Sequence, residues 1–364
     1  MKIVTVVGAR PQFIKASAIS RCIREDYATE VQEILVHTGQ HHDENMSAVF
    51  FDELKIPEPK YNLAISGGGH GAMTGRMIEA IENVLLLEKP ETLLVYGDTN
   101  STLAAALAAA KLHIPIAHVE AGLRSFNMRM PEEINRMLTD KLSTYLFCPT
   151  DIAVKNLQQE GMRQGIYHVG DVMYDTALFF SHQATQQSSL LSTLKLEQGE
   201  FVLVTCHRAE NTDDKDKLFN ILMAIAKIAN DLPVVFPLHP RTLACINRYG
   251  LGDCLQNIRV IEPLSYLDMV SLEQSAQVIL TDSGGVQKEA FFYGVPCVTM
   301  REETEWVETV ILGWNQIVGT DQNKIYSAFL QAKKGRNDYL PYGDGRCSQR
   351  IMSKIVETQY AYYN

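Results

Sequence analysis

Short apolar runs rich in β-branched residues recur along the chain and are typical of buried strands. A first series of such runs covers residues 3–7, 33–37, 92–96, 115–119 and 145–148. A second series covers residues 201–205, 233–238, 258–261, 278–281 and 296–300. The pattern therefore predicts two groups of strands, one in each half of the chain.

Helical patterns of hydrophobic and polar positions separate these runs. Examples are residues 74–87 and 102–111 in the first series, and 217–229 and 286–293 in the second. Alternation of strand and helix predicts parallel sheets joined by right-handed crossovers. Two series of this kind predict an α/β protein built from two doubly wound, Rossmann-like domains.

The boundary between the domains is expected near a polar stretch. Residues 183–200 are rich in Ser and Gln and carry no strand signal, so we interpret them as a surface segment that follows a helix around 171–180. The tail, residues 349–360, has an amphipathic helical pattern and is suited to docking on the first domain. We expect an N-terminal domain at 1–170, completed by a helix at about 350–364, and a C-terminal domain at 171–349. The cleft between two such domains is the default ligand site.

Composition narrows the class of protein. The chain has 364 residues, which is long for one domain and suits two, and 46% of them are hydrophobic. The net charge of −10, from 33 basic and 43 acidic residues, argues against nucleic acid or an anionic membrane as a partner. The strand predicted at the N-terminus leaves no room for a signal sequence, and no apolar run approaches the roughly 18 residues that span a bilayer.

Seven cysteines, without C-x-x-C spacing, sit mostly in apolar contexts. We interpret them as reduced core residues of a cytoplasmic protein.

The segment after the strand at 115–119 carries the most informative chemistry. His118-Val119-Glu120-Ala121-Gly122-Leu123-Arg124 is followed by Pro131-Glu132-Glu133-Ile134-Asn135-Arg136, which places three carboxylates and two guanidiniums within one short stretch. Open α/β sheets bind ligands at the carboxyl ends of their strands, and acids beside arginines suit proton transfer next to an anionic substrate. The alternative is a solvated charged loop that feeds a helix.

Two other strand ends of the first domain carry candidate residues. After the first strand, Gly8 permits a tight turn and Pro11 suits a first helical turn, so Arg10 and Lys15 are expected near a helix N-terminus that favours anions. Neither a G-x-G-x-x-G fingerprint nor a Walker lysine pattern is present. Asp98, after the third strand, is either a site residue or simply the N-cap of the next helix.

The second domain opens with a His-Arg pair, His207 and Arg208, at a strand end, where both can donate to a diphosphate. Cys206, beside them, falls on the buried side of the strand and is predicted to be a core residue rather than a nucleophile. His239 and Arg241, after the next strand, add positive charge to the same predicted rim.

A further strand ends at Thr281-Asp282-Ser283-Gly284-Gly285. Ser283 can cap the following helix, and two glycines let the backbone approach a phosphate at the helix N-terminus. Glu289, one turn into that helix, suits hydrogen bonds with a ribose diol. Arg301, Glu302 and Glu305 follow the next strand and extend the rim. The alternative is a simple glycine-containing turn.

Three histidines near one strand, His37, His41 and His42, raise the question of zinc. No cysteine accompanies them and their spacing matches no common zinc site, so we expect neither a metal nor another cofactor.

Taken together, these motifs resemble the non-hydrolysing UDP-N-acetylglucosamine 2-epimerases, a family that shares the GT-B fold of many glycosyltransferases. The resemblance runs essentially from end to end. It is carried, in family order, by the motifs G-A-R-P…K, G-D-T, H-V-E-A-G-L-R, P-E-E-x-N-R, H-R-x-E-N, T-D-S-G-G and the segment Arg301-Glu302-x-Thr304-Glu305.

The resemblance implies an anti elimination of UDP to a 2-acetamidoglucal, followed by re-addition with the opposite configuration at C2. The implied product is a precursor for bacterial surface polysaccharide. By resemblance, the acid–base candidates are Asp98, Glu120 and Glu132, and His207 assists the departure of UDP. The implied substrate contacts are Arg10, Lys15, Arg129, Arg136, His239, Ser283, Gly284, Gly285, Glu289 and Arg301. Dimerisation is also implied.

Departures from the family pattern indicate one branch of this epimerase family. Residues 125–131 and 68–76 look most like the enzymes that act on UDP-2,3-diacetamido-2,3-dideoxy-glucuronate, and Arg129 would pair with the C6 carboxylate of that substrate. Ala9 and Gln12 stand where well-known members have Thr and Glu. Ser47 stands where a glutamine of an allosteric substrate site is common, which puts that regulation in doubt.

Three other functions remain open at this stage. A GT-B glycosyltransferase would bind a UDP-sugar in a similar way but would need an acceptor surface. A hydrolysing epimerase would release UDP and free sugar. A non-catalytic UDP-sugar sensor would have no need for three carboxylates together.

Overall fold

The computed structural model describes residues 1–40, 51 and 53–363 and divides the chain into two compact units. Unit 1 comprises residues 1–176 and 340–364, and unit 2 comprises residues 177–339. His41, His42 and Ser47, which bear on the zinc and allosteric hypotheses, lie outside the described residues.

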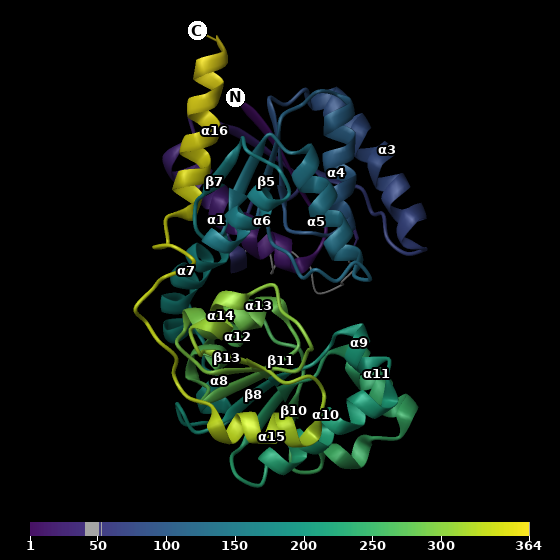
Figure 1. Cartoon of the computed structure of the whole chain (residues 1–364), viewed down its shortest axis with the longest axis vertical. Helices are drawn as coiled ribbons and strands as arrows, with labels where there is room; N and C mark the ends of the chain where they lie inside the picture. The colour runs from purple at the N-terminus through teal and green to yellow at the C-terminus, as the bar shows by residue number, and fades with distance from the viewer. Residues whose placement is uncertain (41–50, 52, 364) are drawn as a thin grey trace. The chain divides into compact units, whose positions relative to one another are not determined.

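Unit 1 is a parallel sheet with helices between its strands (Figure 1). Its strands are β1 (Lys2–Val7), β2 (Gln32–His37), β3 (Tyr61–Asn62), β4 (Thr92–Tyr96), β5 (Ile116–Val119), β6 (Tyr145–Cys148) and β7 (Ile166–His168). Its helices are α1 (Arg10–Asp26), α3 (His70–Glu88), α4 (Asn100–Lys111), α5 (Pro131–Leu142), α6 (Asp151–Gln159) and α16 (Cys347–Tyr363), and α7 (Val172–Gln187) leads into unit 2. The strand order is β3-β2-β1-β4-β5-β6-β7, so the connections reverse direction between β1 and β4.

The core of unit 1 explains why α4 lies so close to the sheet. Ala104, Ala105 and Ala108 of α4 are buried together with Val4 and Val95 of the strands. Small side chains allow the helix backbone to approach the strands, whereas α3 contributes larger residues to the same cluster.

Helix α16 brings the end of the chain back to unit 1, where it packs against α1. Its first turn is fixed by Asp175, whose carboxylate accepts hydrogen bonds from the backbone N–H groups of Cys347 and Ser348 at 3.1 and 2.8 Å. The hydroxyl of Ser348 adds a third bond at 2.7 Å. One buried carboxylate therefore anchors the returning segment.

Unit 2 repeats the architecture. Its strands are β8 (Val202–Thr205), β9 (Val234–Pro237), β10 (Arg259–Ile261), β11 (Val278–Thr281), β12 (Cys297–Thr299) and β13 (Asn315–Ile317), in the parallel order β10-β9-β8-β11-β12-β13. The helices are α8 (Leu190–Thr193), α9 (Ala209–Thr212), α10 (Lys215–Ile228), α11 (Pro240–Tyr249), α12 (Tyr266–Ser275), α13 (Gly284–Phe292), α14 (Val307–Ile311) and α15 (Gln322–Gln331), with a 3₁₀ turn at Gly252–Leu255. The apolar face of α10 packs into the largest buried cluster of this unit.

The predicted α/β class and both series of strands are confirmed, with boundaries that differ by one or two residues. Strands β3, β7 and β13 were not predicted, because each is short and includes polar residues, so none of them lies in an apolar run. Residues 183–200 contain no strand and lie mostly at the surface, as predicted, but the helix expected at 171–180 continues as α7 to Gln187 and α8 follows.

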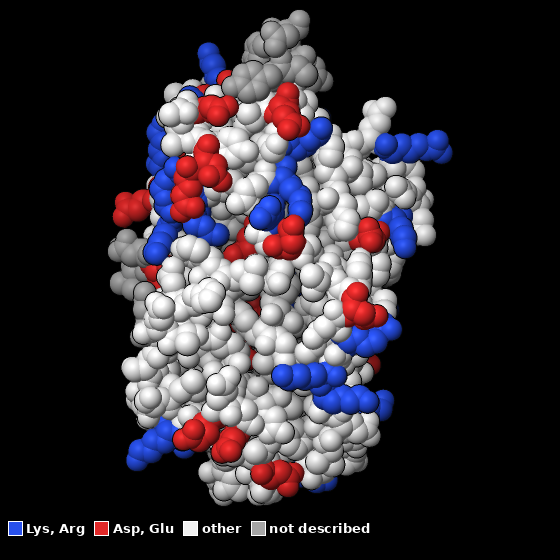
Figure 2. Space-filling view, turned by 90° about the vertical axis from the view of Figure 1, so that its left-hand side faces the viewer, with Lys and Arg blue, Asp and Glu red and all other residues white. Residues whose placement is uncertain are grey.

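Two features of the whole chain bear on its partners. Within the described residues, no helix is long and apolar enough to cross a membrane. Figure 2 shows one face of the molecule, on which basic and acidic side chains are interspersed rather than gathered into an extended basic patch.

Candidate active site

The first-domain candidates lie at the carboxyl ends of three neighbouring strands of unit 1. Arg10 follows β1, Asp98 follows β4 and Glu120 follows β5. In parallel α/β sheets, ligands bind at this edge, where the strand order reverses. The fold therefore brings together residues that are more than a hundred positions apart in the sequence.

Glu120 is buried and forms an ion pair with Lys15 of α1. Its backbone is in the left-handed region, with φ of 69°, which a residue with a side chain seldom adopts. Gly97 lies against this pair: a Cβ at this position would be 3.4 Å from both the Glu120 Oε2 and the Lys15 Nζ. Glycine is favoured at this position by its backbone, because the φ of Gly97 is 62°, in the left-handed region.

Asp98 does not cap α4, so the capping alternative was wrong. Thr99 is the N-cap, and its hydroxyl accepts from the backbone N–H of Thr102. The carboxylate of Asp98, one-third exposed, instead forms an ion pair with Arg136 of α5. Arg136 is buried and also donates to Glu133 at 2.9 Å, so its guanidinium is shared between two carboxylates.

The two adjacent glutamates of α5 have different surroundings. Glu133 is buried, and its carboxylate accepts from the backbone N–H groups of Ser125 and Phe126 at 2.9 and 3.0 Å. Glu133 therefore holds the loop before the helix. Glu132 is half-buried and has no hydrogen bond or ion pair with any described residue, which leaves its carboxylate available to a ligand.

Arg129 lies in the loop that Glu133 organises. Its side chain is exposed, and its backbone N–H donates to Asn127 Oδ1 at 3.2 Å. Within the described part of the chain, its guanidinium has no acidic partner.

Gln12 holds together two of the turns that carry candidate residues in unit 1. This role was not predicted from the sequence. Its Oε1 accepts from the backbone N–H of Gly8 at 2.8 Å, and its Nε2 donates to the carbonyl of Tyr96 at 2.8 Å. It thereby ties the turn after β1 to the turn after β4. The sequence offered one hint, because Gln12 stands where relatives of this motif carry Glu.

In unit 2, the candidates follow four neighbouring strands. His239 follows β9, His207 follows β8, Ser283 follows β11 and Arg301 follows β12. The imidazoles of His207 and His239 lie with their ring centroids 5.6 Å apart. His239 also caps α11, because its Nδ1 accepts from the backbone N–H of Arg241 at 3.1 Å.

Asp282 organises the segment that carries His207. It is fully buried, and its carboxylate accepts from the backbone N–H groups of His207 and Arg208 at 3.0 and 2.9 Å and from Asn211 Nδ2 at 3.2 Å. His207 Nδ1 lies 3.4 Å from the same carboxylate, which orients the ring. Sequence reasoning gave Asp282 no role.

Burial lowers the pKa of His207, and the nearby cations Arg208, His239 and Arg241 lower it further, against the opposing effect of Asp282. The neighbouring Cys206 is buried, as predicted, and burial together with Asp282 raises the pKa of its thiol. A thiolate nucleophile at this position is therefore disfavoured.

The two glycines begin α13. Ser283 is the N-cap, as predicted, with its hydroxyl accepting from Val286 N at 3.5 Å. A Cβ on Gly284 would lie 3.3 Å from the indole nitrogen of Trp306. Glu289 is buried and accepts a hydrogen bond from the Tyr266 hydroxyl at 3.2 Å. Unpaired backbone N–H groups at such a helix start are suited to anions.

Arg301, which was predicted to extend the edge of the site, is buried rather than exposed. Its guanidinium is buried, 3.3 Å from Glu305 and 3.4 Å from Glu210. The two carboxylates raise the pKa of Arg301 in spite of burial.

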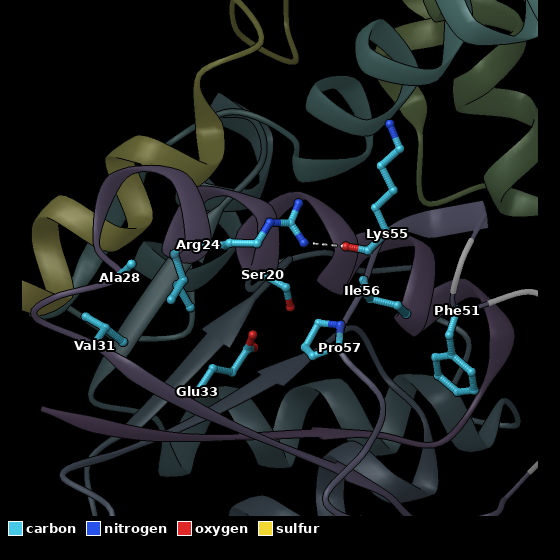
Figure 3. A pocket seen from close by; sticks show the side chains of 10 residues that line it. Ser20, Arg24, Ala28, Val31, Glu33, Phe51, Lys55, Ile56 and Pro57 are labelled. Carbon is cyan, nitrogen blue, oxygen red and sulfur yellow. Dashed lines mark hydrogen bonds between the residues drawn. The ribbon is translucent and has the colours of Figure 1, made fainter. Parts of the chain in front are cut away.

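Unit 1 also contains a cavity of about 560 Å³ that none of the candidate residues lines. It lies beside the second half of α1 and the start of β2 (Figure 3), where Glu33 and Ser20 point toward its interior and Arg24 donates to the carbonyl of Lys55 at 2.8 Å. Burial raises the pKa of Glu33. Among the described residues, no cluster of His, Cys, Asp and Glu is arranged to hold a metal ion, here or elsewhere.

Comparisons with known proteins agree with this geometry. The model of the family described as UDP-N-acetylglucosamine 2-epimerase matches residues 24–356. A relative from Pseudomonas aeruginosa PAO1, UDP-2,3-diacetamido-2,3-dideoxy-D-glucuronate 2-epimerase, is 56% identical, with 98% of this chain and 100% of the relative covered.

Solved structures of UDP-GlcNAc 2-epimerases are also similar to this chain. The Methanocaldococcus jannaschii UDP-GlcNAc 2-epimerase, in complex with UDP-GlcNAc and UDP, matches with a TM-score of 0.90 and 44% identity over 98% of this chain and all of that one. The Neisseria meningitidis UDP-GlcNAc 2-epimerase bound to UDP-GlcNAc matches with a TM-score of 0.87 and 30% identity, at 98% and 100% coverage. The expected GT-B-like class of two Rossmann-like units is confirmed, and the chain belongs to the UDP-N-acetylglucosamine 2-epimerase family.

Proposed function

We propose that this protein is a non-hydrolysing UDP-sugar 2-epimerase that inverts C2 of a UDP-2-acetamido sugar. The observation that carries the proposal is the arrangement of Asp98, Glu120 and Glu132 on neighbouring elements of unit 1, two of them paired with cations. Inversion at C2 requires a proton acceptor on one face of the sugar and a donor on the other, and this set supplies both.

The proposed reaction proceeds by elimination and re-addition. A carboxylate removes the C2 proton, the C2–H electron pair becomes the C1–C2 double bond, and the C1–O electron pair leaves with UDP. The C2 proton has no adjacent carbonyl, so loss of UDP must accompany its removal. A protonated carboxyl then delivers a proton to the opposite face of C2, and the diphosphate oxygen attacks C1 again.

The residues of unit 1 act on the sugar in this proposal. Lys15 has a double role, because it is paired with Glu120 and is also a candidate contact of the diphosphate. An anion that draws Lys15 away would leave Glu120 free to accept a proton, which links substrate binding to activation of the base. Arg10, at the first turn of α1, and Arg136 are further contacts of the anionic substrate.

Unit 2 binds UDP in this proposal. The backbone at Gly284 and Gly285, with Ser283, receives a phosphate at the start of α13, and Glu289 accepts hydrogen bonds from the ribose. His207 and His239 contact the diphosphate, and His207 assists its departure. Arg301 lies at the sugar side and is held there by Glu305 and Glu210.

We propose UDP-2,3-diacetamido-2,3-dideoxy-glucuronate as the preferred substrate, with UDP-N-acetylglucosamine as the alternative. Two observations support this choice: the 56% identity to the Pseudomonas enzyme of that name, and the exposed Arg129 three residues before Glu132. A guanidinium at this position can bind the C6 carboxylate, which UDP-N-acetylglucosamine lacks.

We place the enzyme in the cytoplasm, in the synthesis of precursors for bacterial surface polysaccharide, as a homodimer. Six of its seven thiols are buried and all are free, which suits a reducing compartment. Ile134 and Leu138, one turn apart on α5, expose apolar surface that a second copy could cover. Light scattering on the purified protein would give the mass in solution.

Proton NMR in D₂O tests the proposed function. The protein is incubated in parallel with the diacetamido-glucuronate and the N-acetylglucosamine nucleotide sugars. We expect deuterium at C2 of an intact, inverted UDP-sugar, and faster turnover of the acidic substrate. Stoichiometric release of UDP would identify a hydrolase. Absence of exchange on both substrates would favour a glycosyltransferase or a UDP-sugar sensor.

A further inference from the structure

A buried histidine–aspartate pair lies directly behind the candidate carboxylates. His118 of β5 and Asp140 of α5 are both fully buried, with His118 Nδ1 at 2.7 Å from Asp140 Oδ1. The other ring nitrogen, Nε2, lies 2.7 Å from the carbonyl oxygen of Gly97. Each ring nitrogen of His118 therefore faces an oxygen that can accept a hydrogen bond.

Asp140 has further polar partners besides His118. Its second oxygen accepts from the backbone N–H of Gly122 at 3.2 Å and lies 2.8 Å from Arg124 Nη1. Arg124 is in turn bound by both carboxylate oxygens of Glu160, at 2.6 and 2.8 Å. Burial of polar side chains is costly unless such contacts satisfy them.

Each contact of this pair leads to a segment that carries a candidate carboxylate. Gly97 directly precedes Asp98, and Gly122 comes two residues after Glu120. Asp140 itself is on α5, which also carries Glu132. The pair is therefore bonded to the turn after β4, the turn after β5 and the helix that follows.

The strained conformation of Glu120 depends on these contacts. A left-handed non-glycine residue persists only where its surroundings hold the backbone in place. Here Gly97 N donates to the Val119 carbonyl at 3.0 Å on one side of Glu120, and Gly122 N donates to Asp140 on the other. Loss of the pair would remove the side-chain contacts with the Gly97 carbonyl and the Gly122 N–H and leave only backbone hydrogen bonds around Glu120.

We propose that His118 and Asp140 are positioning residues for the two C2 proton transfers, because they fix Asp98, Glu120 and Glu132 relative to one another. This inference rests on the proposed epimerase function. Neither residue touches the substrate: each acts through the backbone of the turns and through α5.

Two substitutions of His118 separate its contacts. In His118→Asn, the shorter amide can still donate to Asp140 but no longer reaches the Gly97 carbonyl. In His118→Gln, the longer amide can reach the Gly97 carbonyl but loses Asp140. Because small displacements of reacting groups cost about 100-fold in rate, we expect kcat per folded protein to fall by about 10- to 100-fold in each variant, with KM little changed.

The decisive readout is the ratio of C2 deuterium in recovered substrate to that in inverted product, measured in D₂O. A smaller folded fraction lowers both deuterium signals in proportion, whereas displacement of one carboxylate relative to another changes their ratio. We expect the ratio to change at least 3-fold, in different degrees for the two variants. A ratio and a kcat per folded protein equal to those of the unmodified enzyme would overturn the inference.

Two control variants match the substitutions. His168→Gln removes a histidine–aspartate pair at the surface, in which Nδ1 of His168 on β7 lies 3.1 Å from Asp151 Oδ1 on α6. Ile116→Val makes a small cavity in β5 beside His118 and lowers the melting temperature without removing a polar contact. Both controls should keep the wild-type ratio.

Backbone hydrogen exchange gives a test that does not require activity. His118→Asn should increase exchange in peptides that cover residues 97–99 and 120–122, and Ile116→Val should not. If the unmodified protein shows no C2 exchange, the proposed function fails, and hydrogen exchange still decides whether the pair positions these turns. Unchanged exchange in His118→Asn would refute the positioning role.

Discussion

At the scale of single residues, the candidate site is defined by carboxylates that already have cationic partners. Lys15 pairs with Glu120, and Arg136 pairs with both Asp98 and Glu133. Each of these cations is also a candidate contact of the anionic substrate. The proposed function therefore links substrate binding to proton transfer through the same side chains.

Arg129 provides a prediction on substrate choice. Arg129→Ala should lower kcat/KM for UDP-2,3-diacetamido-2,3-dideoxy-glucuronate by about 10- to 100-fold, because a hydrogen-bonded charge contributes about 1.5–3 kcal/mol. Turnover of UDP-N-acetylglucosamine should stay the same. Arg163→Ala, which removes another exposed arginine of unit 1, is the control. Equal losses on the acidic and neutral sugars would rule out the pairing with C6.

His207 provides a prediction on pH. Its pKa is lowered in the free protein by burial and then by the surrounding cations, and a bound diphosphate would raise it. Binding of UDP near pH 7 should therefore take up as much as one proton. Affinity should weaken as the pH rises through the interval between the lowered pKa of His207 in the free protein and its raised pKa in the complex.

Calorimetric titrations of UDP in buffers with different ionisation enthalpies measure this proton uptake. His207→Gln should abolish the protein's share of the uptake, and comparison with this variant removes the contribution of the nucleotide's own phosphate. An identical proton count in the two proteins would show that His207 does not titrate on binding.

At the scale of elements, helix ends and strand ends are joined by a few polar side chains. Glu88, the last residue of α3, accepts from Lys60 and Tyr61 at 2.5 and 2.6 Å and from Lys2 at 3.1 Å. These contacts lower the pKa of Glu88 from 4.5 to about 2, and the hydrogen bond from Lys60 has the largest effect. One carboxylate thus connects α3 with the starts of β1 and β3.

Glu88→Gln should destabilise the protein at neutral pH. Because the folded pKa lies below the unfolded value, the stabilisation is present above about pH 4.5 and is lost as the pH falls through about 2. We expect a loss of about 1 kcal/mol at pH 7, after allowance for solvent screening of the exposed lysines, and none at pH 2. Urea unfolding between pH 2 and pH 7 measures the difference in the free energy of unfolding between Glu88→Gln and the unmodified protein. Glu79→Gln, which changes an exposed glutamate of the same helix, is the control. A pH-independent difference would exclude the ionic explanation.

At the scale of the whole molecule, unit 1 is built from two separate parts of the chain. The returning helix α16 buries Ile351, Met352 and Ile355 completely. Each such side chain contributes about 1.5–3 kcal/mol when fully buried, so the last part of the chain carries a substantial share of the stability of unit 1. Unit 2, by contrast, is one continuous segment.

Removal of residues 347–364 should therefore destabilise unit 1 selectively. We expect scanning calorimetry of the truncated chain to show a transition at lower temperature for unit 1, while UDP still raises the melting temperature of unit 2. A chain that ends at Thr358 keeps these three buried residues and serves as control. Loss of the UDP effect on truncation would contradict the assignment of nucleotide binding to unit 2.

The alternation of strands and helices, the two α/β units and the strand ends that carry candidate residues could all be predicted from the amino-acid sequence. These features are local: a buried strand needs a short apolar run, and a helix start needs a suitable cap or a proline, as at Ser283 and Pro11. Motifs distributed along the whole chain also predicted the family to which the protein belongs. Strands β3 and β13 leave no such signal, because they are short and include polar residues.

The contacts between polar side chains could not be predicted before the fold was known. Asp98 was compatible with a helix cap and with a site role until the fold placed Arg136 beside it. Likewise, His118 and Asp140 are 22 positions apart, and Gly97 is 21 positions before His118, yet their hydrogen bonds join three elements. Pairing across strands and helices depends on register and distance in three dimensions, and neither composition nor periodicity encodes these directly.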